Sequence, residues 1–249
     1  MIEYNFSGKY FVIAGATGGI GSLLSRELKR FGANLFVCGR DQAKLEALKS
    51  ELGCEGSVIE GSSFSSYEEA FSIAANQGQI NGAVCCTGSV ILKSAHATTQ
   101  QEFDATIAAN ATSAFGLTRS AAKTMMSKGG SIVLVASAAS QIGLQNHEAI
   151  AAAKGAVMGL TLSAAATYAR SNIRVNCIAP GLVETPLTAR LTSNEASRKA
   201  SEAMHPIGRL GKPEDIVSMM IWLLSDQASW VTGQIVGVDG GLGSLKVRV

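Results

Sequence analysis

The chain has 249 residues, of which 47% are hydrophobic and only 16% charged, and this balance indicates a large buried core. Its 21 basic and 19 acidic residues leave a net charge of +2, which gives no electrostatic reason to expect a nucleic-acid partner. No apolar run reaches the ~18 residues that span a bilayer, and the first residues lack the pattern of a signal peptide. We therefore expect a cytoplasmic protein without a membrane partner.

Five cysteines are an odd number, and most of them lie in apolar, strand-like runs. Such residues are typical of a protein core in a reducing compartment. The cysteines therefore predict neither a disulfide framework nor a metal site.

Strand-like and helix-like stretches alternate along the chain. Apolar runs predict strands at residues 10–14, 34–38, 57–60, 82–86, 131–136, 173–178 and 235–238. Helical periodicity occupies the intervals, at about 23–31, 41–52, 67–76, 99–108, 110–126, 147–169 and 213–224. This alternation predicts one α/β domain over residues 1–249, a Rossmann fold whose doubly wound parallel sheet carries helices on both faces.

The first strand runs directly into three glycines, Gly15, Gly19 and Gly21, and a helical pattern follows. Glycines permit a sharp turn and let a pyrophosphate approach the backbone, while the helix N-terminus supplies free N–H groups. Because the spacing occurs between a strand and a helix, it predicts a dinucleotide site. A glycine-rich loop without a ligand is the alternative.

Arg40 follows the second predicted strand, where dinucleotide folds select their cofactor. A guanidinium matches a 2′-phosphate as a forked donor, whereas an acidic residue would hold the ribose hydroxyls of NAD. The position therefore favours NADP(H) and leaves NAD(H) possible. A solvated arginine at the end of the loop is the alternative.

Three ordered motifs resemble those of the short-chain dehydrogenase/reductase family over essentially the whole chain. AGATGGIG resembles the TGxxxGIG turn, IRVNCIAPGLVETPL resembles RVNxIxPGxxxTP, and VDGG resembles the motif that ends the sheet. The resemblance implies a seven-stranded sheet and a mobile substrate lid at about residues 185–206. It also implies further cofactor contacts, at Thr17, Ile20, Pro180, Gly181, Val183 and Thr185.

The same resemblance implies a catalytic set of serine, tyrosine and lysine, assisted by an asparagine. Asn110, Ser137 and Lys154 match three of these positions, and Lys154 would also hold the cofactor ribose. Ile150 stands where the family has its tyrosine. An alkyl side chain cannot transfer a proton. The chain therefore resembles an atypical member of the family, one without the catalytic tyrosine.

Two cofactor positions also depart from the family pattern. The NNAG motif is replaced by CCTG, so that only its glycine, Gly88, is retained. Ser63 takes the place of an aspartate that usually contacts adenine. Both residues remain predicted cofactor contacts, with a looser hold on the adenine.

His147 is the first candidate for the missing acid/base. It lies seven residues before Lys154 and about one turn, ~4.5 Å, from the position of Ile150. Enoyl-thioester reductases, a branch of the superfamily that this spacing resembles, place their tyrosine seven residues before the lysine. An imidazole ordinarily titrates near pH ~6.5, which suits acid/base work. An exposed structural histidine is the alternative, and Ser137 or a water could also supply the proton.

Other residues have structural alternatives too. Ser137 could serve only its turn, and Asn110 could be a helix-kink or capping residue. A lysine among small residues on a tightly packed helix is hard to explain structurally, which favours ribose contact by Lys154. The family commonly pairs this helix and that of Asn110 in a four-helix bundle, which implies a homodimer or homotetramer.

Two functional hypotheses follow. The first is an NADP-dependent oxidoreductase that moves hydride between nicotinamide and a carbonyl, an alcohol or an activated double bond of a small molecule. The second is a catalytically degenerate NADP(H)-binding sensor or partner subunit, which the missing tyrosine favours. We expect residues 91–98 and 143–146 to line the substrate pocket, but nothing in the sequence names the substrate or the physiological direction.

Overall fold

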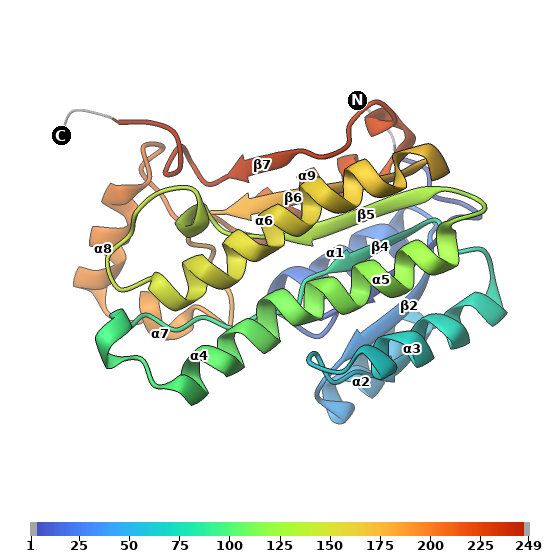
Figure 1. Ribbon diagram of the computed structural model, residues 1–249, viewed down its shortest axis with the longest axis horizontal. Coiled ribbons are helices and arrows are strands. Elements are labelled where there is room, and N and C mark those ends of the chain that lie inside the picture. The colour runs from blue at the N-terminus through green and yellow to red at the C-terminus, as the bar shows by residue number, and fades with distance from the viewer. Residues whose placement is uncertain (1–3, 247–249) are drawn as a thin grey trace.

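A computed structural model describes residues 4–246 of the chain, and its centre is one parallel sheet (Figure 1). The sheet has seven strands in the order β3-β2-β1-β4-β5-β6-β7. Their bounds are β1 (Tyr10–Ala14), β2 (Asn34–Gly39), β3 (Glu55–Val58), β4 (Gly82–Cys85), β5 (Gly130–Val135), β6 (Ile173–Pro180) and β7 (Ile235–Val238). The predicted doubly wound α/β fold is confirmed.

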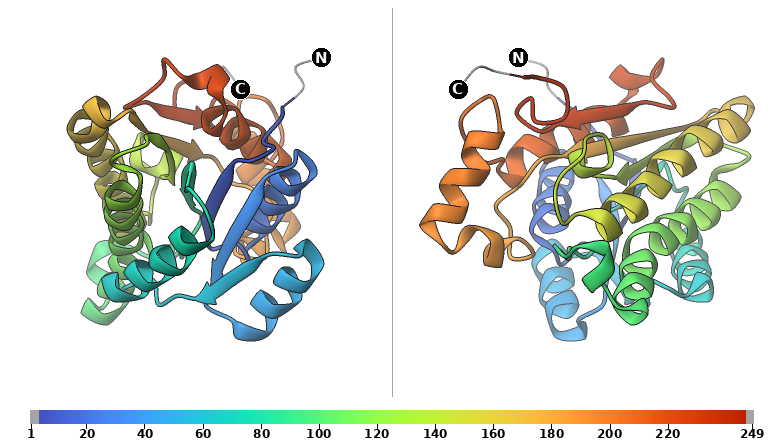
Figure 2. Two further views of the ribbon diagram at one scale, coloured as in Figure 1. Left: turned by 90° about the vertical axis from the view of Figure 1, so that its right-hand side faces the viewer. Right: turned by 60° about the vertical axis from the view of Figure 1, so that its left-hand side comes forward.

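Helices cover both faces of the sheet, which Figure 2 shows as a central layer between two helical ones. Their bounds are α1 (Gly19–Arg30), α2 (Gln42–Leu52), α3 (Phe64–Gln77), α4 (Gln100–Ile107), α5 (Ser113–Met125), α6 (Glu148–Tyr168), α7 (Ala189–Thr192), α8 (Glu195–Met204) and α9 (Pro213–Leu224). Side chains of α1, α2 and α9 share one core cluster, and those of α3, α5 and α6 share the other.

The strands supply both cores because successive side chains point to opposite faces. Within β1, Val12 and Ala14 pack toward α3, α5 and α6, whereas Phe11 and Ile13 pack toward α1, α2 and α9. This double burial explains why β1 and β5 are almost wholly apolar. All strands are parallel, so the loops that follow them meet at one edge of the sheet.

The structure shifts two predicted segments and shows the secondary structure of a third. The third strand is Glu55–Val58 instead of residues 57–60, because it pairs with Phe36 to Gly39 at the sheet edge, where its own apolar pattern is weak. The third helix begins at Phe64, since the hydroxyl of Ser63 accepts the N–H of Ser66 and caps it. The segment expected to be a mobile lid contains α7 and α8.

One stretch of the described chain, residues 148–171, is long and apolar enough to cross a membrane, with a mean hydropathy of 1.5. The buried share of its most apolar window is 44%, and Val157, Ala164 and Ala165 pack into the core beside the sheet. A core helix meets the same criterion of length and composition, so the expectation of no membrane partner stays a prediction.

Candidate active site

The glycine turn between β1 and α1 requires the absence of side chains. Gly15 has φ +76°, and a Cβ there would lie 2.7 Å from the carbonyl carbon of Cys86. A Cβ on Gly21 would overlap the carbonyl oxygen of Gly15. The helix starts at Gly19 with no side-chain cap, so its first N–H groups remain available to a phosphate. These features fit the predicted pyrophosphate cradle.

We predict that Gly21→Ala will lower the free energy of unfolding by about 1–3 kcal/mol, because the methyl group collides with rigid backbone. Urea denaturation would measure the change. Gly143→Ala is the matched control, since a Cβ there meets no atom within 4 Å, and its effect should stay within about 0.5 kcal/mol. Equal stability of the two variants would contradict the close approach at Gly21.

The end of β2 leaves Arg40 available. Asp41, its neighbour, caps α2 by accepting the N–H of Lys44 at 3.1 Å, and its other oxygen lies 3.8 Å from Lys44 Nζ. Arg40 is exposed and forms no ion pair within residues 4–246. A Cβ on Gly39 would lie 2.9 Å from Thr17, so the second strand and the glycine turn are in contact here. The arrangement leaves the guanidinium, rather than the carboxylate, for a ligand.

Ser63 caps helix α3, a role that the sequence prediction did not include. Its hydroxyl caps α3 and lies 2.8 Å from the hydroxyl of Ser65. The side chain is half-buried at the loop after β3. Adenine contact by Ser63 therefore stays a prediction, and the capping role is independent of it.

Asn110, Lys154 and Gly88 lie close together, although they belong to three separate parts of the chain. A Cβ on Gly88 would lie 2.8 Å from Asn110 Oδ1 and 3.5 Å from Lys154 Nζ. Both polar side chains are buried, with 1% of Asn110 and 7% of Lys154 exposed. A side chain at position 88 would separate the two groups, which gives the retained glycine of the CCTG segment a physical reason.

The helix that carries Asn110 contains a π-helical turn, Ala108–Thr112, between α4 and α5. Such single turns occur frequently at functional sites. The Asn110 amide donates to the carbonyl oxygens of Thr106, at 2.9 Å, and of Ser89, at 3.3 Å. Asn110 thus lies at a local irregularity, as its structural alternative supposed, and also bridges to the loop after β4. The sequence prediction missed Ser89, which no motif marks.

Lys154 is held by the end of β5. Its Nζ donates to the carbonyl oxygen of Val135 at 2.7 Å, two residues before Ser137. The hydroxyl of Ser137 accepts the N–H of Ala139 at 3.2 Å and remains half-buried at the strand end. Ser137 therefore does serve its turn, but the same loop brings it to the strand end that anchors Lys154.

Three cysteines lie near enough to the Lys154 ammonium to influence its pKa, and no sequence pattern indicated this. Burial lowers the pKa of Lys154, an effect that the charged forms of Cys85 and Cys177 would oppose. Burial also raises the pKa of Cys85, and that of Cys177 to about 11, so both thiols are protonated near neutral pH. All five cysteines are free. Within residues 4–246 no cluster of three or more His, Cys, Asp or Glu side chains could hold a metal.

His147 lies immediately before α6, with φ −110° and ψ 13°. Ile150 and Lys154 share one face of α6, whereas His147 precedes the first residue of that helix. Its Nδ1 is 2.7 Å from the carbonyl oxygen of Gln145. A carbonyl only accepts hydrogen bonds, so Nδ1 carries the hydrogen and Nε2 is the atom available for proton exchange. The acid/base role stays a prediction.

The segment after β6 closes the site from the opposite side. A Cβ on Gly19 would lie 3.1 Å from Thr185 and from Pro186, so this segment contacts the glycine turn. Val183 is buried and forms a bridge with Gly211. The predicted cofactor residues of the glycine turn and of the segment after β6 therefore lie in one region.

The sheet order and the glycine turn define a Rossmann-type dinucleotide-binding protein. The family model described as enoyl-(acyl carrier protein) reductase matches residues 15–243. This match, together with the fold, shows that the chain belongs to the short-chain dehydrogenase/reductase family of oxidoreductases.

Relatives of known name agree with this assignment. A tropinone reductase homolog of Arabidopsis thaliana is 32% identical over 249 residues, covering 96% of this chain and 94% of its own length. The 3-oxoacyl-(acyl-carrier-protein) reductase of Rickettsia felis is 32% identical over 239 residues, covering 96% and 98%.

Solved structures have the same fold. A short-chain dehydrogenase/reductase from Mycobacterium ulcerans has a TM-score of 0.92 at 29% identity, with 96% of this chain and 91% of that one covered. A single-residue variant of the actinorhodin polyketide ketoreductase with NADPH has a TM-score of 0.90 at 27% identity, with 96% and 98% covered.

Proposed function

We propose that the protein is an NADP-dependent oxidoreductase that transfers hydride between nicotinamide and a carbonyl or alcohol, or an activated C=C bond, of a small molecule. The observation that carries this proposal is the convergence of Asn110 and Lys154 on Gly88 beside the end of β5. A protein without catalytic work has no chemical reason to retain Asn110, Ser137 and Lys154 together. The names of the relatives, ketone and 3-oxoacyl reductases among them, support a ketone carbonyl as the first substrate class to test.

The residues present fit a bound dinucleotide, since the glycine turn leaves open the space that Cβ atoms would fill. The nicotinamide ring, when bound, supplies or accepts the hydride. The Lys154 ammonium has three N–H donors. One of them donates to the carbonyl oxygen of Val135, so two remain for ribose hydroxyls. Ser137 polarises the substrate oxygen. The proton comes from His147 through Nε2 or from a water, and Ser137 is the third candidate for the proton donor.

The preference for NADP(H) over NAD(H) rests on Arg40. The NADPH in the similar ketoreductase structure supports it. We predict that Arg40→Asp will shift the ratio of NADPH to NADH affinity by at least ~10-fold toward NADH, through loss of charged hydrogen bonds and new repulsion. Fluorescence titration with each cofactor measures the ratio. Arg170→Asp makes the same charge change on an exposed residue at the other end of the sheet and should leave the ratio unchanged. If both variants behave alike, Arg40 is not the selector.

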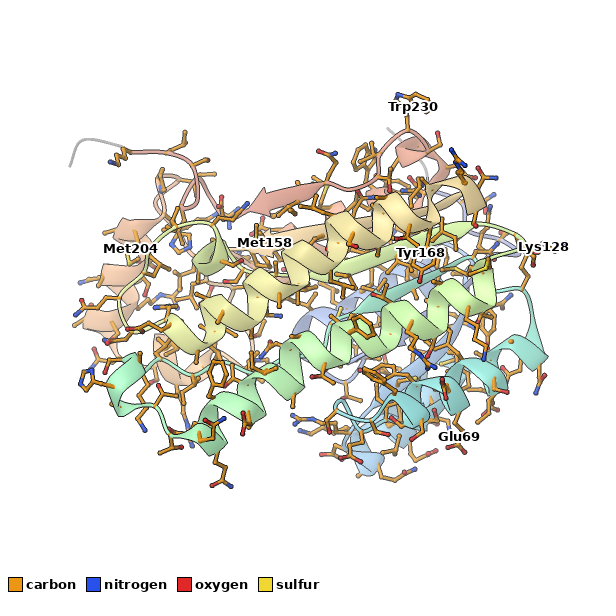
Figure 3. All side chains as sticks on the ribbon, in the orientation of Figure 1. Glu69, Lys128, Met158, Tyr168, Met204 and Trp230 are labelled. Carbon is orange, nitrogen blue, oxygen red and sulfur yellow. The ribbon has the colours of Figure 1, made fainter. Side chains whose placement is uncertain are left out.

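We also propose a homodimer or homotetramer in the cytoplasm. Exposed apolar side chains support self-association, among them Phe115 on α5 and Leu162 on α6. Trp230, whose side chain is 99% exposed, projects from the loop before β7 (Figure 3). Free thiols at all five cysteines fit a reducing compartment. Sedimentation velocity tests the assembly.

The second candidate function is a catalytically degenerate NADP(H) sensor or partner subunit. Ile150 favours it, because this buried alkyl group lies one turn before Lys154, where the family has its proton donor. Ile150→Tyr separates the two hypotheses. Turnover that appears only in this variant would identify the wild-type chain as degenerate.

The test of function follows NADPH oxidation with a panel of ketones, aldehydes and enones that includes tropinone and a 3-oxoacyl thioester. Turnover by the wild type that disappears in Lys154→Ala would establish a reductase that works despite Ile150. Tight NADPH binding without turnover on the whole panel would favour the sensor. Failure to bind NADPH at all would overturn both hypotheses.

A further inference from the structure

Helix α8 forms the C-terminal part of the lid. None of its own side chains is buried, and Figure 1 shows α8 at one end of the molecule, beside α7. Side-chain hydrogen bonds tie the helix and its final cap to the segment after β6 at two points. Arg198 donates to Glu184, and His205, the residue that ends the helix, accepts the N–H of Leu182 at 3.1 Å. Both anchors hold the segment that continues from Gly181 to Thr185.

His205 is the buried anchor of the two. Only 4% of His205 is exposed, whereas more than a third of each side chain in the Arg198–Glu184 pair faces solvent. Water competes for an exposed ion pair and screens it, but it cannot replace a buried acceptor. The bond from Leu182 to His205 therefore contributes more to the attachment of the lid.

The hydrogen bonds of His205 define its protonation state. Nδ1 lies 2.7 Å from the carbonyl oxygen of Ser201, which can only accept, so Nδ1 carries the hydrogen. Nε2 faces the N–H of Leu182 and must therefore be the acceptor. A Cβ on Gly181 would lie 2.6 Å from this Nε2, so Gly181 allows the ring to sit against the backbone. The contact requires a neutral imidazole.

The charged side chains of the neighbouring segments have partners other than the ring. On α8, Glu202 pairs with Arg198, which also pairs with Glu184 of the segment after β6. In the turn after β7, the carboxylate of Asp239 accepts the N–H groups of Gly241 and Gly243. Among residues 4–246, no carboxylate forms an ion pair with His205. The hydrogen bond with Leu182 is therefore the contact that Nε2 makes.

We propose that His205 is a positioning residue that holds the lid against residues 181–185 through its hydrogen bond with Leu182. The inference rests on the proposed function, in which Gly181, Val183 and Thr185 contact the cofactor. Loss of this hydrogen bond should therefore weaken NADPH binding and loosen the lid together. His205 touches neither substrate nor reacting atoms and acts through the backbone of Leu182.

Two amide variants test the proposal. In His205→Gln the side-chain oxygen reaches the position of Nε2 and accepts from Leu182 without titrating, whereas His205→Asn reaches only the position of Nδ1. We expect His205→Asn to weaken NADPH binding at least ~5-fold at about pH 8, and His205→Gln to stay within ~2-fold of the wild type.

Limited trypsin digestion supplies a readout that does not depend on the cofactor. Arg190, Arg198 and Lys199 are cleavage sites within the lid. Without cofactor, they should be cut faster in His205→Asn than in the wild type, whereas His205→Gln should be cut at the wild-type rate. Equal cleavage of the wild type and His205→Asn would overturn the proposal, and so would faster cleavage of a folded His205→Gln. If the wild type did not bind NADPH but digestion followed this order, the proposed function would fail and the anchoring would stand.

Discussion

Lys154→Met is expected to lower kcat/KM by about 10²–10³-fold, an effect comparable to the loss of one preorganised donor in an enzyme site. Methionine keeps an unbranched apolar stem of similar length, so packing on α6 is largely retained while the charge is lost. The carbonyl of Val135 then loses its donor, and the cofactor ribose loses the ammonium proposed to orient it. Steady-state kinetics with NADPH and the best substrate of the panel measures the loss.

The control for this variant is Lys123→Met, on the exposed side of α5. It removes the same charge without touching the cluster of Asn110 and Gly88, and it should leave kcat/KM within ~2-fold. Thermal unfolding of both variants separates a catalytic loss from a folding loss. If Lys154→Met retained wild-type turnover in a folded protein, the buried lysine would have no part in the reaction.

His147→Ala is expected to reduce turnover by ~10²-fold or more if this imidazole is the acid/base. Nε2 is the ring nitrogen available to exchange a proton, because Nδ1 is engaged by the carbonyl of Gln145. Rates at saturating NADPH isolate the chemical step from cofactor binding.

A second variant sharpens this experiment. Ser137→Ala tests the other side chain that could donate the proton. Unchanged turnover in His147→Ala together with a large loss in Ser137→Ala would exclude His147 and transfer the role to the serine or to a water that it holds.

Local patterns were sufficient for most of the fold. The alternation of apolar strands and amphipathic helices predicted the sheet, and α9 and β7 have the predicted bounds of 213–224 and 235–238. Two predictions shifted at the edge of the sheet. β3 is a short strand of mixed polarity whose position is determined by pairing with β2, and the start of α3 depends on the cap at Ser63.

The site also contains residues that the sequence predicted and residues that it could not predict. Motif positions predicted Asn110, Ser137 and Lys154, because their residue types occur at fixed places relative to strand ends. Ser89 and the cysteines near Lys154 could not be predicted, since their proximity to the site depends on how β4, β5 and β6 are juxtaposed. His147 shows the limit of helical spacing, because the spacing to Lys154 is correct while the helix itself begins one residue later.

The sequence by itself determined the strand, glycine turn and helix of the cofactor cradle, because those depend on residues adjacent in the chain. It also determined that Ile150 precedes Lys154 by one turn, since helical periodicity alone requires this. Only the tertiary structure decided that Asn110 and Lys154 meet at Gly88, and that His205 closes on Leu182 across 23 residues. Contacts between distant segments follow from packing of the whole sheet and its helices, and no local pattern encodes them.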